Sequence, residues 1–298
     1  MREFFYPVDE KSDGLTVQEF LYEHGYSKRL VIRLKQTESG LTVQGRRVRS
    51  TTVLRRGDTL CTVMPEGSQR RTDAKIDIPI LYEDEDMIVC DKPAGLACHR
   101  SGGHRDDTLE QAFEGGALRA VYRLDKDTSG LLVLAKHPLA AARLHTAVEK
   151  RYLSVAQGFF SQKKGAVEMP LLRRTPYEPK QIFDPAGLPA RTVYRVLWEG
   201  EGRSAVLCRL MTGRMHQIRA HFAEVGHPLL GDAMYGGDCT LLSRQALHCA
   251  AIRLEHPVTG KELFFFSEVP TDLRTVLPES LCGKFIFPIC TNSLKECL

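Results

Sequence analysis

The sequence has no hydrophobic run long enough to cross a membrane, since apolar stretches such as Leu263 to Phe266 extend over only a few residues. Its first residues show no apolar segment of the kind found in secretory leaders. We therefore expect a soluble, cytoplasmic protein that does not act at a membrane.

Paired cysteines are also missing. The nine cysteines include no CxxC pair, which argues against a zinc ribbon and against a disulfide framework. Cys282, Cys290 and Cys297 lie near the C-terminus, but their spacings are too wide to indicate a metal site. Reduced and mostly buried thiols are the simpler interpretation.

A strong overall charge is absent as well, because the formal net charge is only +4 over 298 residues. The bases are unevenly distributed, however. Between Lys28 and Arg56 the sequence contains nine bases and one acid, Glu38. Such a one-sided cluster predicts a surface that binds phosphate groups, although a solvated charged face is the alternative.

The basic cluster lies in a small N-terminal unit. Apolar spacing predicts one helix that ends near Gly25 and a second helix over 27–37, followed by short strands joined at Gly45 and at 56–58. A polar, turn-rich segment follows and marks a boundary. We therefore divide the chain into a small module at 1–66, a linker at 67–75, a large domain at 76–278 and a terminal segment at 279–298.

The large domain is rich in predicted strands. Strands are expected on both sides of an acidic turn before Lys92, at 151–160, and in a hairpin formed by 192–198 and 204–211. Two helices are predicted, one over 137–150 with Pro138 in its first turn and one over 214–226 closed by Gly226. With 43% hydrophobic and 26% charged residues, the chain is predicted to form an α+β fold around a large mixed or antiparallel sheet.

The stretch "VYRLDKDTSGLLVLAK", Val121 to Lys136, contains the strongest candidate for chemistry. Asp125 lies between two bases and precedes a Thr-Ser-Gly turn and an apolar strand. A carboxylate at the mouth of a buried strand is held rigidly and stays reachable, and the neighbouring bases keep it charged. It could act as a nucleophile or base, or it could simply cap the turn or pair with Arg123.

This stretch resembles the catalytic signature of the RluA family of RNA pseudouridine synthases, which reads His-Arg-Leu-Asp followed by Thr-Ser-Gly. Three further matches follow the family's order, namely "EDEDMIVCDKPAGLACH", "EKRYLSVAQG" and "TGRMHQIRAHFAEVGHPLLGDAMYG". Tyr122 replaces the family's His and Met215 a usual Thr, and the segment between Thr108 and Val121 is shorter. The N-terminal module is similar to a small RNA-binding module of ribosomal-protein type, through "LTVQGRRV" and "LRRGDTLCTV".

The resemblance implies an isomerase that converts uridine to pseudouridine in structured RNA without a cofactor or metal. Large-subunit ribosomal RNA is the expected target, and transfer RNA is the alternative. By their places in the matched motifs, Asp125 is the implied nucleophile, Arg219 its cationic partner, and Tyr152 the base or a ring that stacks on uracil. Whether the sugar or the base bonds to Asp125 stays open.

The same resemblance and the basic cluster give the predicted RNA contacts. Arg123 is expected beside a nucleotide that is flipped out of its helix or loop. The other predicted RNA-binding residues are Arg214, His216, Gln217, Lys28, Arg29, Arg46 and Arg47. We expect the protein to act on RNA as a monomer.

Three other interpretations were weighed. His216 and His221 are five residues apart, so they lie on different helix faces and, with His227, do not indicate a metal site. Ser129 lacks the Gly-x-Ser-x-Gly setting of a hydrolase nucleophile. A non-catalytic RNA-binding or ribosome assembly factor is the more serious alternative, and the retention of Asp125, Tyr152 and Arg219 favours an enzyme.

Overall fold

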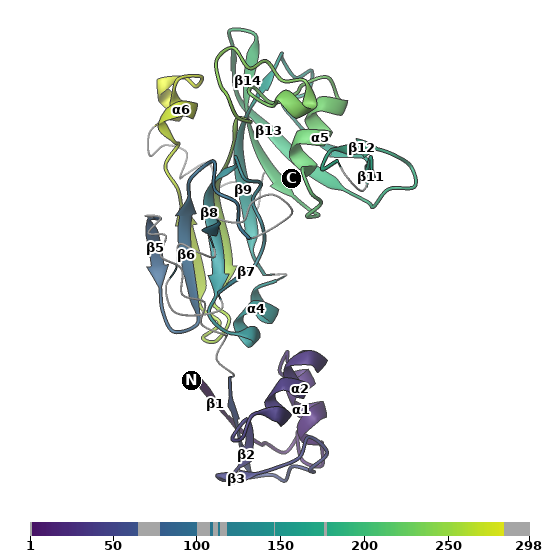
Figure 1. Cartoon of the computed structure of the whole chain (residues 1–298), viewed down its shortest axis with the longest axis vertical. Coiled ribbons are helices and arrows are strands. Elements are labelled where there is room, and N and C mark those ends of the chain that lie inside the picture. Colours follow the sequence, from purple (N-terminus) through teal and green to yellow (C-terminus); the bar gives the residue numbers. More distant parts are fainter. Residues whose placement is uncertain are drawn as a thin grey trace.

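The computed structural model describes residues 2–64, 78–99, 108–109, 113, 118–145, 147–175 and 178–282. The predicted linker lies outside these residues, as does most of the predicted terminal segment, with Cys290 and Cys297. A four-stranded and a ten-stranded sheet with few helices confirm the predicted α+β class (Figure 1). No helix among the described residues is long and apolar enough to span a membrane.

The N-terminal module consists of a four-stranded sheet in the order β1-β4-β2-β3 and two helices. Both predicted helices are present, and each begins at a hydroxyl side chain that accepts a backbone N–H, Thr16 for the first and Ser27 for the second. The bounds are β1 Glu3–Pro7, α1 Val17–Glu23, α2 Lys28–Gln36, β2 Leu41–Val43, β3 Arg46–Arg47 and β4 Thr59–Val63.

Strand β1 was not expected from the sequence, which predicted only two helices and a hairpin. It pairs antiparallel with β4, with Glu3 opposite Val63. Phe4 points into the core, whereas Phe5 is 62% exposed. Because the strand is only five residues long, its alternation is too short to distinguish it from an irregular N-terminus.

The module contacts the large sheet through α4, Pro138–Leu144. Leu139 of this helix is fully buried in the module's own hydrophobic core. Arg143 donates one hydrogen bond to His24 O at 2.9 Å and another to Pro257 O at 2.8 Å. A ring contact between Phe4 and His137 adds to this junction.

The large sheet has the strand order β10-β13-β14-β9-β15-β8-β6-β5, with β16 beside β15 and β7 beside β8. Its only parallel pair among the described strands is β8 with β15, so the sheet is mixed. The bounds are β5 Ile80–Glu83, β6 Met87–Lys92, β7 Arg119–Ala120, β8 Ser129–Ala135, β9 Glu149–Gln157, β10 Lys164–Glu168, β13 Arg191–Gly200, β14 Arg203–Leu210, β15 Leu247–Glu255 and β16 Glu262–Phe266.

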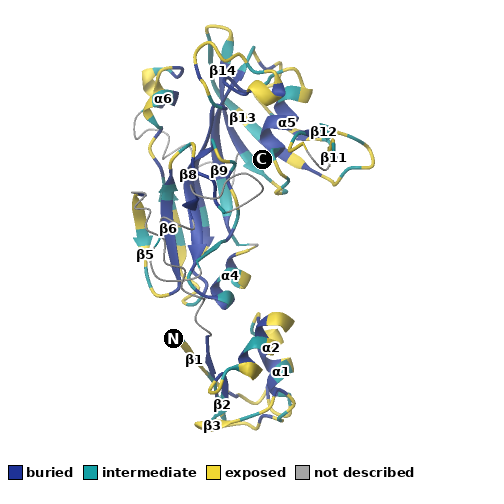
Figure 2. Cartoon of the chain, viewed as in Figure 1, coloured by how far each residue is buried: buried dark blue, intermediate teal, exposed yellow. Residues whose placement is uncertain are grey.

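The remaining elements flank this sheet. A separate β11–β12 hairpin projects beside α5 (Figure 1). Its strands and the other short elements are β11 Leu171–Arg173, β12 Gln181–Phe183, α5 Gln217–Glu224, η1 Ala233–Tyr235, α6 Thr271–Arg274 and η2 Glu279–Leu281. The central strands are the most buried part of the chain (Figure 2), and every residue of β8 is buried.

The predicted helix over 137–150 is too long. In the structure it ends at Leu144, and Glu149 and Lys150 already belong to β9. These two residues pair with Arg253 and Ile252 of β15, so sheet pairing overrides their local helical preference. The predicted hairpin is present as β13 and β14, and the helix closed by Gly226 is present as α5.

Candidate active site

Asp125 lies in the turn that leads into β8. The turn is closed by a hydrogen bond from Thr128 N to Asp125 O, and Gly130 follows with φ +109. A Cβ atom on Gly130 would lie 2.4 Å from Cys249 O, so only glycine lets β8 and β15 approach this closely. The strand that follows the Asp125 turn is therefore held closely against β15 from its first residues.

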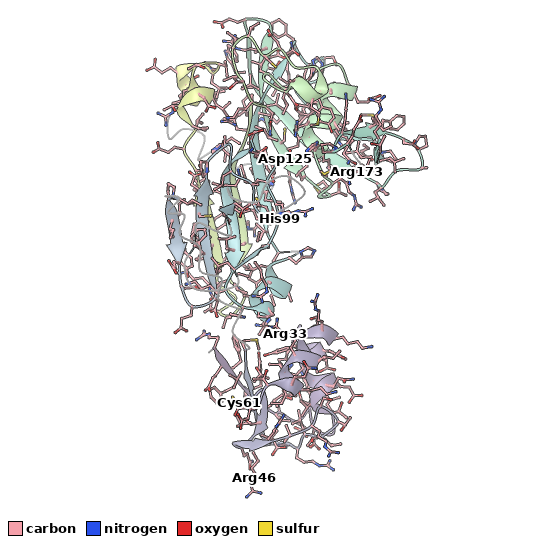
Figure 3. The ribbon with its side chains drawn as sticks, viewed as in Figure 1. Arg33, Arg46, Cys61, His99, Asp125 and Arg173 are labelled. Carbon is pink, nitrogen blue, oxygen red and sulfur yellow. The ribbon has the colours of Figure 1, made fainter. Side chains whose placement is uncertain are left out.

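Asp125 lines a cavity of about 350 Å³ that is open to solvent. Its side chain keeps 24% of its surface exposed, so a substrate can reach it. Figure 3 places it where the central strands meet the part of the fold that carries α5. The other lining residues are Arg123, Leu124, Thr128, Tyr152, Leu210, Arg214, His216, Gln217, Ile218, Arg219 and Leu247.

Arg219 of α5 makes the expected contact with Asp125. Its Nη1 lies 3.2 Å from Asp125 Oδ2, although the two residues are far apart in the sequence. Burial of the guanidinium would lower its pKa, but Asp232 and Asp125 act against this and raise the pKa above its usual range. Arg219 is therefore a permanent cation beside Asp125.

Asp232 is a site residue that sequence reasoning missed. It binds Arg219 through two further hydrogen bonds, Nε to Oδ2 at 2.7 Å and Nη2 to Oδ1 at 2.8 Å. Only 1% of its surface is exposed. The one available signal was that it is the sole acid in "HPLLGDAMYG".

Tyr152 of β9 lines the same cavity and is buried. Burial raises the pKa of its phenol well above 10, and the neighbouring Cys249 and Asp125 raise it further. A phenol with an ordinary pKa of about 10 needs a cation or a shielded pocket to act as a base at neutral pH. The pocket is shielded, but the effect of the shielding is to keep the phenol protonated.

His216 and Gln217 occupy the start of α5. His216 has a left-handed backbone with φ 53, and its Nε2 lies 3.9 Å from Asp125 Oδ1. The amide of Gln217 is buried and engaged, because it donates to Arg191 O and Thr192 Oγ1. Its oxygen accepts from Thr212 Oγ1 and Arg214 N. Gln217 therefore fixes the loop before α5.

The predicted RNA contacts fall into two separate groups. Arg123 and Arg214 line the cavity with Asp125. Lys28 and Arg29 begin α2, and Arg46 and Arg47 form β3 of the N-terminal module. Figure 3 shows Arg46 toward the opposite end of the molecule's long axis from Asp125. A second hollow, on the module, is lined by Lys35, Arg47, Val48, Arg49, Ser50 and Thr51.

Arg244 supports the turn that carries Asp125, and sequence reasoning did not single it out. Its Nη1 donates to Asp127 O at 3.0 Å and its Nη2 to Ser129 Oγ at 3.4 Å. Asp272 holds the guanidinium from α6, with contacts of 2.6 and 2.9 Å. The turn is thus tied to a segment near the end of the described chain.

Tyr122, which replaces the family's His, does not line the cavity. Its hydroxyl donates to Leu131 O at 2.8 Å, and the ammonium of Lys150 lies 4.6 Å from the centre of its ring. These contacts tie Tyr122 to one residue of β8 and one of β9. The substitution therefore falls on a residue that packs against the strands next to the site and does not line the cavity.

The three histidines near α5 do not form a shared site. His221 Nε2 bonds to Met169 O, and His227 Nδ1 bonds to Gln157 O. A different group, Asp84, Asp86 and His256, has its potential ligand atoms within 4.8 Å of one another.

This second group is a hydrogen-bonded network. His256 Nδ1 accepts from the backbone N–H groups of Val258 and Thr259, so the proton of a neutral imidazole is on Nε2. That nitrogen lies 2.7 Å from Asp84 Oδ2, to which it donates. With its proton in this bond, Nε2 has no lone pair for a metal ion.

Comparison with known proteins gives consistent similarities. Residues 86–224 match a family described as RNA pseudouridylate synthase. An uncharacterized RNA pseudouridine synthase of Bacillus subtilis, YhcT, is 32% identical, over 90% of this chain and 94% of the relative. The ribosomal large subunit pseudouridine synthase D of Vibrio vulnificus is 37% identical, over 81% of this chain and 83% of the relative. The solved structure of human RNA pseudouridylate synthase domain containing 1 shares the fold, with a TM-score of 0.57 and 23% sequence identity. The match covers 74% of this chain and 96% of the human chain.

Proposed function

Because this chain belongs to the RluA family of RNA pseudouridine synthases, and is therefore an isomerase, we propose that it modifies a uridine of large-subunit ribosomal RNA with Asp125 as nucleophile. The observation that carries the proposal is the contact between Asp125 and Arg219 inside an open cavity. The large-subunit target is supported by relatives such as the ribosomal large subunit pseudouridine synthase D of Vibrio vulnificus.

Asp125 is suited to covalent chemistry because it is both oriented and reachable. Arg219 donates a charge-assisted hydrogen bond to Oδ2 of the carboxylate, and the partial exposure of Asp125 leaves it accessible to a nucleotide. In the reaction, the bond from the uracil nitrogen to the ribose breaks and a bond from a ring carbon to the ribose forms. The hydrogen lost from that carbon is balanced by the hydrogen gained on the freed nitrogen, so no co-substrate is consumed. Attack on the sugar and attack on the base both fit this balance.

Tyr152 serves as a platform for the uracil ring in this proposal. A phenol whose pKa lies well above 10 is protonated at neutral pH and is a weak base. Its ring nevertheless forms part of the wall of the cavity that Asp125 enters. Stacking on an aromatic ring is a common way to hold a base that has left its helix.

The remaining contacts hold the RNA around the extruded uridine. Arg123 and Arg214 line the cavity, where they contact the phosphates beside that nucleotide. Lys28, Arg29 and Arg46, together with the module hollow lined by Lys35, Arg47 and Arg49, contact a second part of the RNA backbone. This arrangement favours a large structured RNA over a short strand.

The test uses the purified full chain with unmodified large-subunit ribosomal RNA and, in parallel, unmodified transfer RNA. After digestion, nucleosides are separated by chromatography and pseudouridine is quantified, with Asp125→Asn as the matched control. We expect pseudouridine on ribosomal RNA with the parent chain, and none with the variant at equal RNA affinity. Product on transfer RNA alone would show that transfer RNA is the substrate. No product on either RNA would favour a binding or assembly role.

A further inference from the structure

A chain of polar contacts connects the β11–β12 hairpin to the catalytic carboxylate. Gln181 N of β12 donates to the hydroxyl oxygen of Tyr235 at 2.8 Å. The same hydroxyl lies 3.2 Å from His216 Nδ1. His216 Nε2, on the other side of the ring, faces Asp125 Oδ1 at 3.9 Å. The side chains of Tyr235 and His216, in the middle of this chain of contacts, are largely buried.

The donor at one end favours one direction for these hydrogen bonds. A backbone N–H can only donate, so the oxygen of Tyr235 accepts from Gln181. The hydroxyl proton of Tyr235 is then available for His216 Nδ1. Burial lowers the pKa of His216, which keeps the ring neutral although Asp125 acts in the opposite direction. A neutral imidazole that accepts at Nδ1 carries its proton on Nε2, the atom that faces Asp125.

We propose that His216 is a positioning residue: its Nε2–H, fixed in this tautomer by Tyr235, orients Oδ1 of Asp125 while Arg219 holds Oδ2. The inference rests on the proposed function, because it assigns a partner to the same carboxylate. Donors on the two oxygens fix the plane of the carboxylate. Oδ1 keeps a lone pair for the substrate, since each oxygen offers two.

The separation of 3.9 Å between Nε2 and Oδ1 is longer than a hydrogen bond. Contacts of this kind are often long in a free enzyme and shorten when the substrate is bound. A small rotation of either side chain closes the gap, because both face the same cavity. Binding of RNA is the event that would bring the two atoms together.

Two features argue that the imidazole is needed for more than the start of α5. His216 occupies the N-cap position, yet its side chain makes no capping hydrogen bond. Its left-handed backbone, with φ 53, is uncommon for residues other than glycine and suits asparagine at least as well as histidine. Helix capping therefore does not explain a histidine at this position, and backbone preference does not single one out.

The β11–β12 hairpin gains a role through the same contacts. The ring of Tyr235 lies between two cations, with Arg219 at 5.1 Å and Lys180 at 5.5 Å from its centre. Lys180 immediately precedes Gln181, and Arg173 lies in the opposite strand. Tyr235 thus links the hairpin to the contacts that end at Asp125.

Two substitutions at one position separate the positioning role from a structural one. The amide nitrogen of His216→Gln reaches the place of Nε2 and can donate to Asp125, whereas His216→Asn reaches only the place of Nδ1. With an unmodified large-subunit ribosomal RNA transcript, we expect single-turnover rates within about tenfold of the parent for Gln and about 100-fold lower for Asn. RNA affinity should be the same in the two variants, so that the difference between them lies in the rate. A backbone role reverses this order, because Asn is the better residue at φ 53; Asn equal to or faster than Gln overturns the inference.

A second measurement does not depend on turnover. Nitrogen-15 NMR of the full chain without RNA should show His216 protonated at Nε2 and unprotonated at Nδ1. Tyr235→Phe removes the donor to Nδ1 and should give a mixture of tautomers. A proton on Nδ1 in the parent chain overturns the inference even if the enzyme is active. If the parent chain shows the expected tautomer but forms no pseudouridine, the proposed function is wrong while the assignment of the His216 tautomer stands.

Discussion

Asp232 binds the guanidinium of Arg219 along one edge, through Nε and Nη2, and so leaves Nη1 to face Asp125. Both residues of this pair are buried, with 1% and 6% of their surfaces exposed. The guanidinium is therefore oriented before any substrate arrives. Asp232 thus fixes the direction of the guanidinium that faces Asp125.

Asp232→Asn should lower the rate of pseudouridine formation far more than RNA affinity. The amide retains the volume but loses the charge and one acceptor, so Arg219 is free to rotate away from Asp125. We expect a loss of about 100-fold in single-turnover rate. Breaking a buried ion pair should also lower the free energy of unfolding by about 3 kcal/mol. Single-turnover assays and urea unfolding measure the two effects.

The control for this variant is Glu262→Gln, which removes the carboxylate partner of Arg253 on the sheet surface. That pair is partly exposed, and its loss should change stability by less than about 1 kcal/mol and leave the rate unchanged. If Asp232→Asn retains the parent rate, the orientation of Arg219 does not depend on Asp232.

The sequence predicts the site residues that touch the cavity better than those that support them. Asp125, Tyr152 and Arg219 each lie in a recognisable motif, and all three line one cavity. Asp232 and Arg244 act through contacts that their own segments do not reveal. Arg244, for example, reaches residues 117 and 115 positions away, and no local spacing encodes such a contact.

The same distinction between local and distant contacts applies to the elements of the fold. The α1 and α2 helices are determined by apolar spacing and capping side chains within a dozen residues, so they were predictable. The first strand, β1, exists only because β4 lies beside it, and the end of α4 is set by pairing of β9 with β15. Pairing partners distant in sequence decide these features.

Arg244→Lys should slow the reaction by loosening the turn that carries Asp125. Lysine keeps the charge but cannot bind Asp272 with two parallel hydrogen bonds and at the same time reach Asp127 O. We expect a roughly tenfold lower single-turnover rate with unchanged RNA affinity. Hydrogen exchange of the amides at 127–129 should become faster in the variant.

Asp272→Asn provides the comparison, because it removes the anchor and leaves Arg244 in place. Burial alone would raise the pKa of Asp272, but the hydrogen bonds from Arg244 outweigh this and lower it. Because the pKa of Asp272 is lower in the folded chain than in the unfolded chain, the pair stabilises the fold at a pH above the unfolded pKa. This stability is lost as the pH falls through the folded pKa. The parent chain should therefore lose more stability on acidification than Asp272→Asn. Equal losses would show that the pair does not anchor the turn.

Replacing Lys35 and Arg47 with glutamine should weaken RNA binding in a salt-dependent way. Both line the hollow on the N-terminal module and lie away from Asp125. Each phosphate contact that is lost should reduce the slope of log affinity against log salt by about 1. Filter binding of ribosomal RNA at several salt concentrations measures this slope.

The matched control for the module variants is Arg274→Gln. Arg274 lies in α6 and pairs with Glu268 on the opposite part of the fold. Its loss should leave the salt slope unchanged. If the module variants and Arg274→Gln give the same slope, the hollow does not bind phosphates.

His248 makes the stability of the protein depend on pH. It is 1% exposed, and its Nδ1 bonds to Ser129 Oγ at 3.0 Å at the start of β8. Burial, with a smaller contribution from Arg244, lowers the pKa of this imidazole from about 6.5 to about 4. The unfolded chain therefore binds a proton that the folded chain does not bind between these values. The free energy of unfolding should fall as the pH falls, by on the order of 2 kcal/mol from pH 6.5 to pH 5.

His248→Asn tests this contribution, because the amide takes the place of Nδ1 beside Ser129 and does not titrate. His137 and His221 are also buried with lowered pKa values, so the variant should keep part of the pH dependence of stability. It should lose the part that comes from the uptake of about one proton on unfolding. Urea unfolding of the full chain at pH 7 and pH 5 measures the difference. Ser129→Ala is the control: it removes the hydrogen bond and should lower stability equally at both pH values. An unchanged pH dependence in His248→Asn would mean that His248 is already protonated in the fold, against the low pKa that its burial imposes.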